Sequence, residues 1–374
     1  MRYCRRCLQP DTRPNTLFSE GVCPACLYFD ELQGMDWGTR FQDFVQVVNR
    51  FPSRSTYDCV IGVSGGKDST RQAMWIRDKL GMRPLLVCVT YPPLISSELG
   101  LRNLSNLVEL GFDVELIQPA PETSRLMMRH AFLNYVNLLK ASEMALFSGV
   151  QRASLYHGIS LVFWGENPAL QLGDLGALGS SGWDGNQLRN MNTLGGGELS
   201  WLLNGGFTTS DLAMYSFPPP GELERRGVQI MYLGWVMGDW SMATNGIHGG
   251  LLGVDFRDDA PEVSGDPFGI TAVDENLTPV NQLLKYLKFG FGRATDYANE
   301  AIRHGMLERG AAINLVENLD GLCAEELIAE FCHYIDITPD DFWSVALNVT
   351  NNVLFDTSQG GRPQPRFMVG VDLP

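Results

Sequence analysis

The sequence predicts an α/β protein with a parallel β-sheet, extended by a short cysteine-containing segment before the sheet and a helical region after it. Three features predict this class. Short apolar runs alternate with helical periodicity between residues 57 and 165, as in a parallel sheet whose strands are joined by helices. A Ser-Gly-Gly turn joins the first of these strands to the first helix. From residue 278 onward the pattern is helical.

The predicted elements follow one another in a regular order. Strands are expected at residues 57–63, 84–89, 112–117 and 161–164. The helices between them are expected at residues 68–80, 98–110 and 122–157. Further helices are expected at 41–48 before the sheet, and at 278–289, 297–306 and 325–334 after it. In such sheets, ligands bind beyond the carboxyl ends of the strands.

The turn Ser64–Ser69 has the composition of a phosphate-binding loop. Gly65 and Gly66 let the backbone approach a ligand closely, and the helix that follows offers unpaired N–H groups and the positive end of its dipole. Ser64 and Ser69 add hydroxyl donors. The simpler alternative is a glycine-rich turn without a ligand.

The spacing of this turn differs from a Walker A loop, because Gly62 is one residue too close to Gly66 and Asp68 replaces the Mg²⁺-binding Ser or Thr. The pattern S-G-G-x-D-S instead resembles the PP-loop of the ATP pyrophosphatases, which split ATP between its α and β phosphates. We therefore expect the turn to hold the pyrophosphate part of ATP, with Mg²⁺ bridging phosphate oxygens. Asp68 would position the metal or orient the loop. Lys67 would neutralise phosphate or point to solvent.

The composition argues against two classes of partner. The chain of 374 residues has a formal net charge of −15 and a pI of about 4.8, which disfavours nucleic acid as the main partner because phosphate contacts need clustered Lys and Arg. We find no apolar run of the ~20 residues that a membrane span requires. The first residues, beginning at Met1, lack the apolar core of a signal peptide. We expect a soluble, cytoplasmic protein of two to three domains.

Four of the eight cysteines have the spacing of a structural zinc site. Two C-x-x-C pairs separated by fifteen residues are typical of a four-thiolate zinc ribbon, with ligands Cys4, Cys7, Cys23 and Cys26. All four ligand positions are then filled, so the zinc is expected to be structural rather than catalytic. The other four cysteines are interpreted as buried small apolar residues.

Polar residues follow the strand that ends at Trp164. Glu166 and Asn167 come directly after it, on the predicted edge of the sheet that also carries the Ser64–Ser69 turn. A role in the site and a simple helix cap are both open for Glu166. Between Gly173 and Gly206 there are ten glycines in 34 residues, which predicts either a lid over the substrate or a tolerated surface loop.

A second candidate ligand site follows the helix at residues 278–289. The stretch from Lys288 to Asp296 gathers Lys288, Arg293 and Asp296 around a glycine-containing helix break, a composition suited to binding phosphate or carboxylate. The alternative for Lys288 is that it lies in the last helical turn only because the helix dipole favours a cation there.

These motifs occur in a characteristic order: the C-x-x-C pairs, S-G-G-K-D-S, W-G-E-N-P at 164–168 and K-F-G-F-G-R-A-T-D at 288–296. Together they resemble the N-acetyl sugar amidotransferase family of bacterial surface-polysaccharide (LPS O-antigen) biosynthesis, within the PP-loop ATP pyrophosphatase superfamily. The resemblance runs over nearly the whole chain and is weakest from Gly173 to Asp274. It implies an enzyme that converts an acetamido group on a nucleotide-linked sugar into an acetamidino group.

The chemistry implied by this resemblance uses ATP, Mg²⁺ and ammonia. Transfer of AMP to the amide oxygen gives an O-adenylyl imidate, so that ammonia adds and AMP leaves. Lys288 and Arg293 are candidates for contacting pyrophosphate or the sugar nucleotide, with Asn167 and Asp296 as further substrate ligands. Glu166 would position the substrate or accept a proton from ammonia. Position 2 is Arg2, not the cysteine of an N-terminal glutaminase, so a partner glutaminase is expected to supply ammonia.

We expect four segments: a zinc ribbon at 1–30, a linker helix within 31–56, a PP-loop ATP pyrophosphatase domain at 57–275 with a Gly-rich insertion at 173–206, and a C-terminal helical region at 276–374. Two other functions compete with the amidotransferase. A PP-loop tRNA-thiolation enzyme would need reactive or cluster-binding cysteines, and Cys59 and Cys88 form no C-x-x-C pair. A non-catalytic zinc-ribbon nucleotide-binding protein would bind ATP without releasing AMP.

Overall fold

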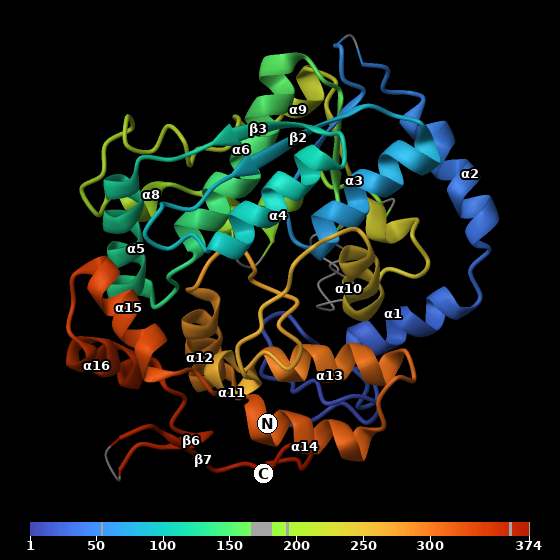
Figure 1. The fold of residues 1–374 in the computed structure, drawn as a ribbon. Coiled ribbons are helices and arrows are strands. Elements are labelled where there is room, and N and C mark those ends of the chain that lie inside the picture. The colour runs from blue at the N-terminus through green and yellow to red at the C-terminus, as the bar shows by residue number, and fades with distance from the viewer. Residues whose placement is uncertain (54, 166–181, 192–193, 359–360, 374) are drawn as a thin grey trace.

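The computed structural model describes residues 1–53, 55–165, 182–191, 194–358 and 361–373. A five-stranded parallel sheet with the order β3-β2-β1-β4-β5 lies in its upper half in Figure 1. The strands are β1 (Cys59–Gly62), β2 (Pro84–Val89), β3 (Asp113–Ile117), β4 (Leu161–Trp164) and β5 (Gln229–Tyr232). The predicted parallel α/β sheet is therefore confirmed, and β5 is an edge strand that the sequence analysis missed.

The strands are apolar on both faces because helices cover both faces. Val60 and Val162 of neighbouring strands point into one core cluster, which α6 (Lys140–His157) covers. Ile61 and Phe163 point into the other cluster, which packs against α3 (Lys67–Leu80). The helices α1 (Pro24–Gln33), α2 (Trp37–Val48) and α4 (Glu98–Glu109) precede or flank the sheet.

The helix predicted at residues 122–157 is in fact two helices. The first, α5 (Pro121–Tyr135), ends because Val136 adopts a left-handed backbone conformation with φ of 48°. The second, α6, begins at Lys140. A left-handed valine is rare, and the sequence has no glycine or proline at this point to signal the break.

The rest of the chain is mainly helical, as predicted for its C-terminal region. After β4 come α8 (Ser200–Leu203), α9 (Glu222–Arg225), α10 (Met242–Leu251) and α11 (Pro261–Ser264). The C-terminal region contains α12 (Thr278–Phe289), α13 (Arg293–Arg303), α14 (Arg309–Leu319), α15 (Glu325–Ile335) and α16 (Pro339–Val349), followed by a short antiparallel pair, β6 (Phe355–Asp356) and β7 (Gln364–Pro365). Among the described residues, short 3₁₀ turns lie at Leu188–Asn190, Gly195–Gly197 and Leu233–Trp235.

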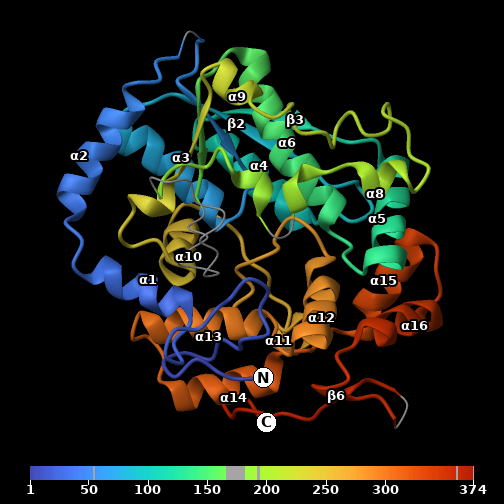
Figure 2. The same cartoon turned by 180° about the vertical axis from the view of Figure 1, so that it is seen from behind.

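The C-terminal helices share an apolar core with α5. The ring of Phe132 on α5 stacks on Phe342 of α16 with 5.3 Å between ring centroids and meets Phe331 of α15 edge to face at 5.1 Å. The start of α16 is fixed by a capping box between Thr338 and Asp341. Figures 1 and 2 show α12 and α13 below the sheet, and α10 lies on the same side of the sheet.

The two ends of the chain lie side by side, as Figure 1 shows. The backbone N–H of Leu373 donates to the carbonyl of Met1 at 2.8 Å, and the N–H of Tyr3 donates to the carboxylate of Asp372 at 2.7 Å. The N-terminal segment also packs against α13. The N–H of Leu8 donates to Oδ1 of Asn299 on this helix at 2.8 Å.

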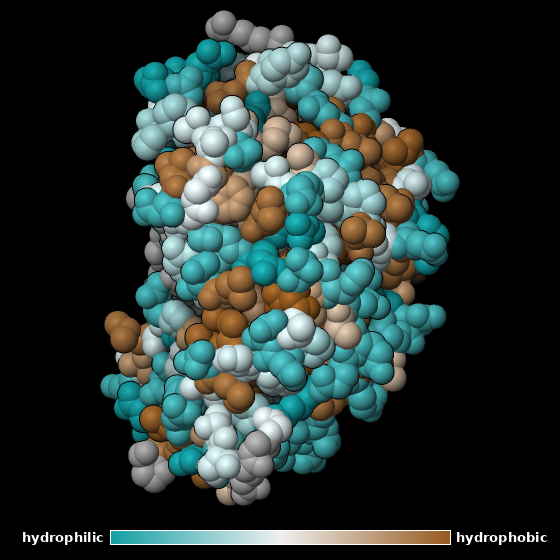
Figure 3. All heavy atoms as spheres, turned by 90° about the vertical axis from the view of Figure 1, so that its left-hand side faces the viewer, coloured by the Kyte–Doolittle hydropathy of each residue, from teal (hydrophilic) through white to brown (hydrophobic). Residues whose placement is uncertain are grey.

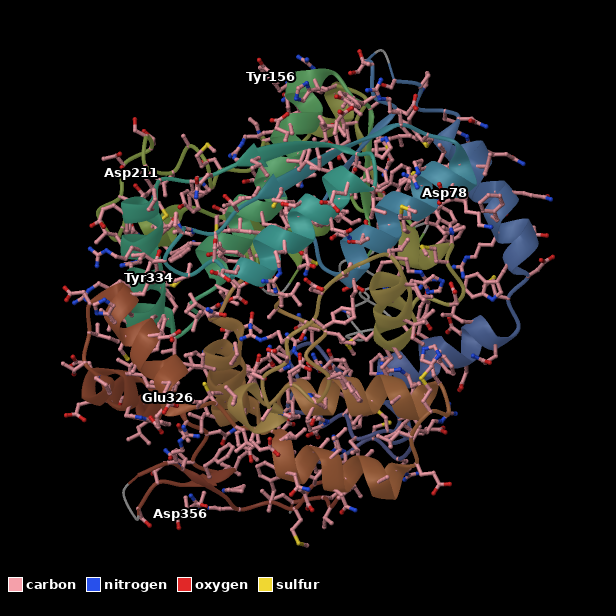
Figure 4. The ribbon with its side chains drawn as sticks, in the orientation of Figure 1. Asp78, Tyr156, Asp211, Glu326, Tyr334 and Asp356 are labelled. Atoms are coloured by element: carbon pink, nitrogen blue, oxygen red, sulfur yellow. The ribbon has the colours of Figure 1, made fainter. Side chains whose placement is uncertain are left out.

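The exterior is a mixture of polar and apolar residues. Figure 3 views the face that carries α5, α8, α15 and α16, where apolar side chains lie among hydrophilic ones. Tyr156, Asp211 and Asp356 lie at the periphery and point away from the sheet (Figure 4). In the part of the chain that the structure describes, every helix is too short or too polar to span a lipid bilayer.

Candidate active site

The Ser64–Ser69 turn lies at the carboxyl end of β1, where β1 passes into α3. The order of the strands reverses at this point, since β2 and β3 lie on one side of β1 and β4 and β5 on the other. In open α/β sheets such a reversal opens a crevice beyond the strand ends, and ligands bind there. The turn therefore occupies the position in the fold where a ligand site is expected.

The conformation of the turn requires glycine at position 65. Gly65 has φ of +80°, which side chains disfavour. A Cβ atom added to it would lie 2.9 Å from the backbone carbonyl carbon of Asn103 and from the backbone nitrogen of Leu104. The backbone of α4 thus packs directly on the turn. Gly66 has φ of −71°, and an added Cβ would meet only ordinary contacts.

The hydroxyl groups of the turn hold its shape. The Ser69 hydroxyl donates to the carbonyl of Gly66 at 3.0 Å and accepts from the backbone N–H of Ser64 at 3.4 Å. The Thr70 hydroxyl donates to the carbonyl of Gly65 at 3.3 Å. These bonds fix the carbonyl groups of the turn, while the first N–H groups of α3 have no partners within the helix and can face a ligand.

Asp68 joins the turn to α10. Its Oδ1 atom accepts a hydrogen bond from the Asn245 side chain at 2.6 Å, and its Oδ2 atom forms an ion pair with Lys67 Nζ at 2.7 Å. The Lys67 side chain is 4% exposed, so the alternative in which it points to solvent is wrong. Gly249 of α10 packs against the Lys67 backbone and Cβ, because a Cβ at Gly249 would lie about 3.0 Å from them.

Arg71 extends this network. Its guanidinium donates to the Asn245 side-chain oxygen and forms an ion pair with Asp239 at 2.7 Å. The Asn245 amide therefore faces Asp68 with its nitrogen and Arg71 with its oxygen, which fixes its orientation. The contacts run from Asp239 through Arg71, Asn245 and Asp68 to Lys67. They connect α3 to α10 and fix the position of the Asp68 carboxylate.

Glu300 of α13 approaches the same place from the C-terminal region. Its Oε1 atom accepts a hydrogen bond from the backbone N–H of Met242, the first residue of α10. Burial raises the pKa of Glu300 to about 7, with a further raising effect from the charge of Asp68 and opposing effects from the Met242 N–H, Arg303 and Lys67. A carboxyl group with this pKa exchanges protons near neutral pH.

The stretch Asp255–Asp274 packs across α4 and the Ser64–Ser69 turn. Asn103 donates to the carbonyl of Asp255 at 2.9 Å, and the N–H of Ser97 donates to the carbonyl of Asp274 at 3.1 Å. Asp274 and Ser64 both line a cavity of about 30 Å³. Burial raises the pKa of Asp274 to about 7, helped by the neighbouring charge of Glu275.

Arg293 and Lys288 occupy different surroundings. Arg293 lies at the start of α13 beside Arg257 and Asp266, and in the described part of the chain its buried Nε atom has no hydrogen-bond partner. Lys288 donates to the carbonyl of Val136 at the end of α5, and burial lowers its pKa. That bond ties α12 to the sheet part of the molecule.

Asp296 forms an ion-pair network between the N-terminal segment and the C-terminal helices. Its two oxygens contact Arg13 and Lys285, the latter at 2.6 Å. Burial would raise its pKa, but the charges of Lys285, Arg13 and Arg293 hold the pKa below the usual range. These contacts give Asp296 a structural role, and its role as a substrate ligand stays a prediction.

Glu166 and Asn167 lie outside the described residues, as do residues 173–181 and 192–193 of the Gly-rich segment. The described residues 182–191 form an addition to the edge of the sheet. Gly185 donates its N–H to the carbonyl of Ile230 at 2.8 Å, and Asp184 forms a β-bridge with Met231 of β5. This part of the segment is thus anchored to β5.

The four N-terminal cysteines form one buried cluster. The sulfur atoms of Cys4, Cys7, Cys23 and Cys26 all lie within 4.8 Å of one another, and those of Cys7 and Cys23 are 3.6 Å apart. Tetrahedral zinc with bonds of about 2.3 Å places its sulfur ligands about 3.8 Å apart, so the cluster fits a zinc ion. Backbone N–H groups of Arg6 and Cys23 donate to Cys4 Sγ. Such bonds would orient a thiolate ligand.

Comparison with known proteins adds one sequence relationship. Residues 266–368, about a quarter of the chain, match the family described as LPS biosynthesis protein WbpG-like, C-terminal domain. This part contains Lys288, Arg293, Asp296 and Glu300. The Ser64–Ser69 turn and the cysteine cluster precede it. Among curated proteins, none matches the sequence.

Two solved structures are similar in part. One is the NH3-dependent NAD synthetase from Campylobacter jejuni subsp. jejuni NCTC 11168 in complex with the nitrate ion, at 19% identity and a TM-score of 0.30, covering 52% of this chain and 94% of that one. The other is the U34-tRNA thiolase NcsA from Methanococcus maripaludis with its 4Fe–4S cluster, at 13% identity and a TM-score of 0.28, covering 89% of this chain and 95% of that one.

Three residues of the site were missed by the sequence analysis: Arg71, Asn245 and Glu300. Arg71 reads as one more polar position of the helix after the turn. Asn245 and Glu300 lie on helices far along the chain, within stretches that carry no recognisable motif. Glu300 stands among other polar residues, such as Asn299 and Arg303, so the local sequence does not single it out.

Proposed function

We propose that this protein is an ATP-dependent amidotransferase. It converts the acetamido group of a nucleotide-linked sugar into an acetamidino group and releases AMP and pyrophosphate. The observation that carries the proposal is the Ser64–Ser69 turn at the sheet's topological switch point, where Asn245 holds Asp68 and Asp68 forms an ion pair with Lys67. The match of residues 266–368 to a WbpG-like C-terminal domain supports a role in LPS biosynthesis.

The reaction needs activation because an amide carbonyl is a poor electrophile and its oxygen is a poor leaving group. The amide oxygen attacks the α phosphorus of ATP, pyrophosphate departs, and an O-adenylyl imidate forms. Ammonia then adds to the imidate carbon, and AMP leaves with the former amide oxygen. Cleavage of ATP thus drives the replacement of a carbon–oxygen bond by a carbon–nitrogen bond.

In this scheme the turn binds the part of ATP that leaves. The N–H groups at the start of α3 hold the pyrophosphate oxygens, and Lys67 neutralises their charge. Asp68, whose side chain is 43% exposed, offers carboxylate oxygen to Mg²⁺, a metal that prefers oxygen ligands. When bound, Mg²⁺ would offset the negative charge that develops on the phosphates.

We assign the sugar nucleotide to the side of the site that is formed by the C-terminal helices. Arg293 has a buried Nε atom without a partner among the described residues, which suits an anionic phosphate group. Glu166, Asn167, Lys288 and Asp296 remain our further candidates for the substrate.

We further propose that a separate protein supplies ammonia, since Cys4 belongs to the cysteine cluster and does not serve as a glutaminase nucleophile. A partner glutaminase would release ammonia next to this chain. Assays with ammonium salts should bypass the partner, whereas glutamine alone should support no reaction.

The test is an assay with ATP, Mg²⁺, an ammonium salt and a panel of nucleotide-linked N-acetyl sugars. We expect AMP and pyrophosphate to form only with the correct sugar, and mass spectrometry to show the decrease expected when an oxygen is replaced by NH. Release of ADP instead of AMP, or ATP binding without any AMP, would contradict the proposal.

The tRNA-thiolation alternative would require a reactive thiol in the sheet domain. Burial raises the pKa of Cys59 well above its ordinary value and raises that of Cys88 to about 12. Thiols with such pKa values are unreactive near neutral pH. Sulfur transfer to tRNA in the same assay format would nevertheless favour this alternative over ours.

A further inference from the structure

A cavity of about 510 Å³ lies between α10 and α13. Its walls are mainly apolar and include Met242, Gly246, Phe268, Ile270, Ala301 and Leu307. Its volume falls within the range of about 300–1,000 Å³ that is usual for small-molecule sites. Figures 1 and 2 both show α10 directly above α13, on the side of the sheet where the Ser64–Ser69 turn lies.

One acidic side chain, that of Glu300, lines this cavity in the described part of the chain. Its carboxylate is held at the wall by the N–H of Met242. Glu300 is close enough to Asp68 and Lys67 for their charges to affect its pKa. The charge of Arg303, on the same helix, affects this pKa as well. His304, the residue that follows α13, also lines the cavity. Glu300 therefore connects the cavity to the residues beside the phosphate-binding turn.

We infer that this cavity binds the acetamido-bearing part of the acceptor, and that Glu300 is the catalytic base that takes a proton from the attacking ammonia. The inference rests on the proposed function and deepens it by assigning the acceptor site and the proton acceptor. The occupant is an uncharged acyl group attached to nitrogen. Apolar walls suit its methyl group.

The proton balance of the step is as follows. The protonated O-adenylyl imidate carries a C=NH⁺ group. The lone pair of ammonia forms a new bond to the imidate carbon while the π pair of the C=N bond moves onto the sugar nitrogen. Glu300 takes one proton from the nitrogen that has added. The carbon–oxygen bond then breaks, its electron pair leaves with AMP, and the carbon becomes the centre of an amidinium ion. Glu300 returns its proton to a phosphate oxygen of AMP and is again a carboxylate.

Two physical properties of the cavity favour this step. Apolar walls limit the access of water, which would otherwise hydrolyse the imidate. The same surroundings raise the pKa of Glu300 to about 7, so that the carboxyl group both accepts and returns a proton near neutral pH. An exposed glutamate would be a much weaker base.

The variant Glu300→Gln separates this role from a structural one. Glutamine keeps an oxygen that accepts the Met242 N–H but cannot accept the proton. We expect acceptor-dependent exchange of labelled pyrophosphate into ATP to persist, because that exchange reports the adenylation step. Amidine formation at saturating ammonia should fall by about 100-fold or more. The wild-type rate should rise with pH around 7, and this dependence should be absent in the variant.

If Glu300 serves only to cap α10, Glu300→Gln will form amidine at the wild-type rate, and the inference is then wrong. Loss of both pyrophosphate exchange and amidine formation in a folded, zinc-loaded variant would also overturn it. An assay of the wild-type protein distinguishes failure of the Glu300 inference from failure of the proposed function. A wild-type protein that makes no AMP with any acceptor would contradict the proposed function itself.

The cavity is tested by Ala301→Leu, which adds volume to its wall. We expect the KM for the acceptor to rise by at least about 10-fold, while the affinity for ATP stays unchanged. The matched control is Ala311→Leu, the same change at an exposed position of α14. Equal KM values for the two variants would show that the acceptor binds elsewhere.

Discussion

The Asn245 side chain donates a hydrogen bond to Asp68 Oδ1 at 2.6 Å, across 177 residues of sequence. Asp68 belongs to the Ser64–Ser69 turn, and Asn245 lies on α10, which also borders the cavity next to Glu300. This bond links the side of the site that we assign to ATP with the side that we assign to the acceptor. It also gives Asp68 a fixed direction before any ligand binds.

Replacement of Asn245 by alanine should lower kcat/KM by about 10- to 100-fold, because a hydrogen bond to a charged group is lost and Asp68 is free to rotate. AMP formation under steady-state conditions measures the effect. Asn314→Ala, at an exposed position of α14, is the control for a general loss of an asparagine. If the Asn245 variant keeps wild-type kinetics, Asp68 does not depend on this bond.

Gly65→Ala should destabilise the protein by about 3 kcal/mol, since it combines a strained φ with overlap against the backbone of α4. Urea unfolding measures the free energy. Gly81→Ala is the matched control, because Gly81 also has a positive φ, of 64°, but an added Cβ meets nothing within 4 Å. We expect the control to cost about 1 kcal/mol. Equal losses of unfolding free energy in the two variants would mean that α4 shifts to make room for the added methyl group.

Glu300→Gln should stabilise the fold at pH 8 and have little effect at pH 4. The folded pKa of Glu300, about 7, lies above its ordinary value of 4.5. Such a group favours the fold below the lower pKa, and this contribution is lost as the pH rises through the higher one. The gain at pH 8 should be about 3 kcal/mol. Thermal unfolding at both pH values measures it, and a gain that is independent of pH would contradict the assigned pKa.

If the cysteine cluster holds zinc as we expect, removal of the metal should disturb α13 as well as the cluster. Residues beside the cysteines hold this helix, through the bond from Leu8 to Asn299 and the ion pair between Arg13 and Asp296. We expect a chelator, or Cys7→Ser, to increase hydrogen exchange in α13 and to lower amidine formation. Zinc added back should restore the chelated protein. Unchanged exchange in α13 after metal loss would limit the zinc to a local role.

The sequence predicted the parts of the molecule whose signals are local. Four strands were recognisable as short apolar runs, and the turn was recognisable from its glycines between a strand and a helix. The strand β5 was missed because it follows the long Gly-rich segment and starts at the polar Gln229. The division of α5 from α6 was missed because a valine takes the left-handed conformation there.

The candidate site was only partly predictable for a similar reason. Lys67 and Asp68 belong to the local motif, whereas Asn245 and Glu300 reach the site through the packing of α10 and α13. No local rule identifies which face of those helices meets the turn. Asp296 and Lys288 were expected to bind ligand, and this stays a prediction. In the structure, Asp296 contacts Arg13 and Lys285, and Lys288 contacts the end of α5. Burial and ion pairing of these charges depend on tertiary contacts.

The most direct test of the account is a crystal structure with Mg²⁺ and α,β-methylene ATP, which cannot be cleaved between its α and β phosphates. We predict that the β and γ phosphates lie within hydrogen-bond distance of the backbone N–H groups between Gly65 and Ser69, with Lys67 beside them. A structure in which this turn is empty and the triphosphate is bound elsewhere would contradict the central claim.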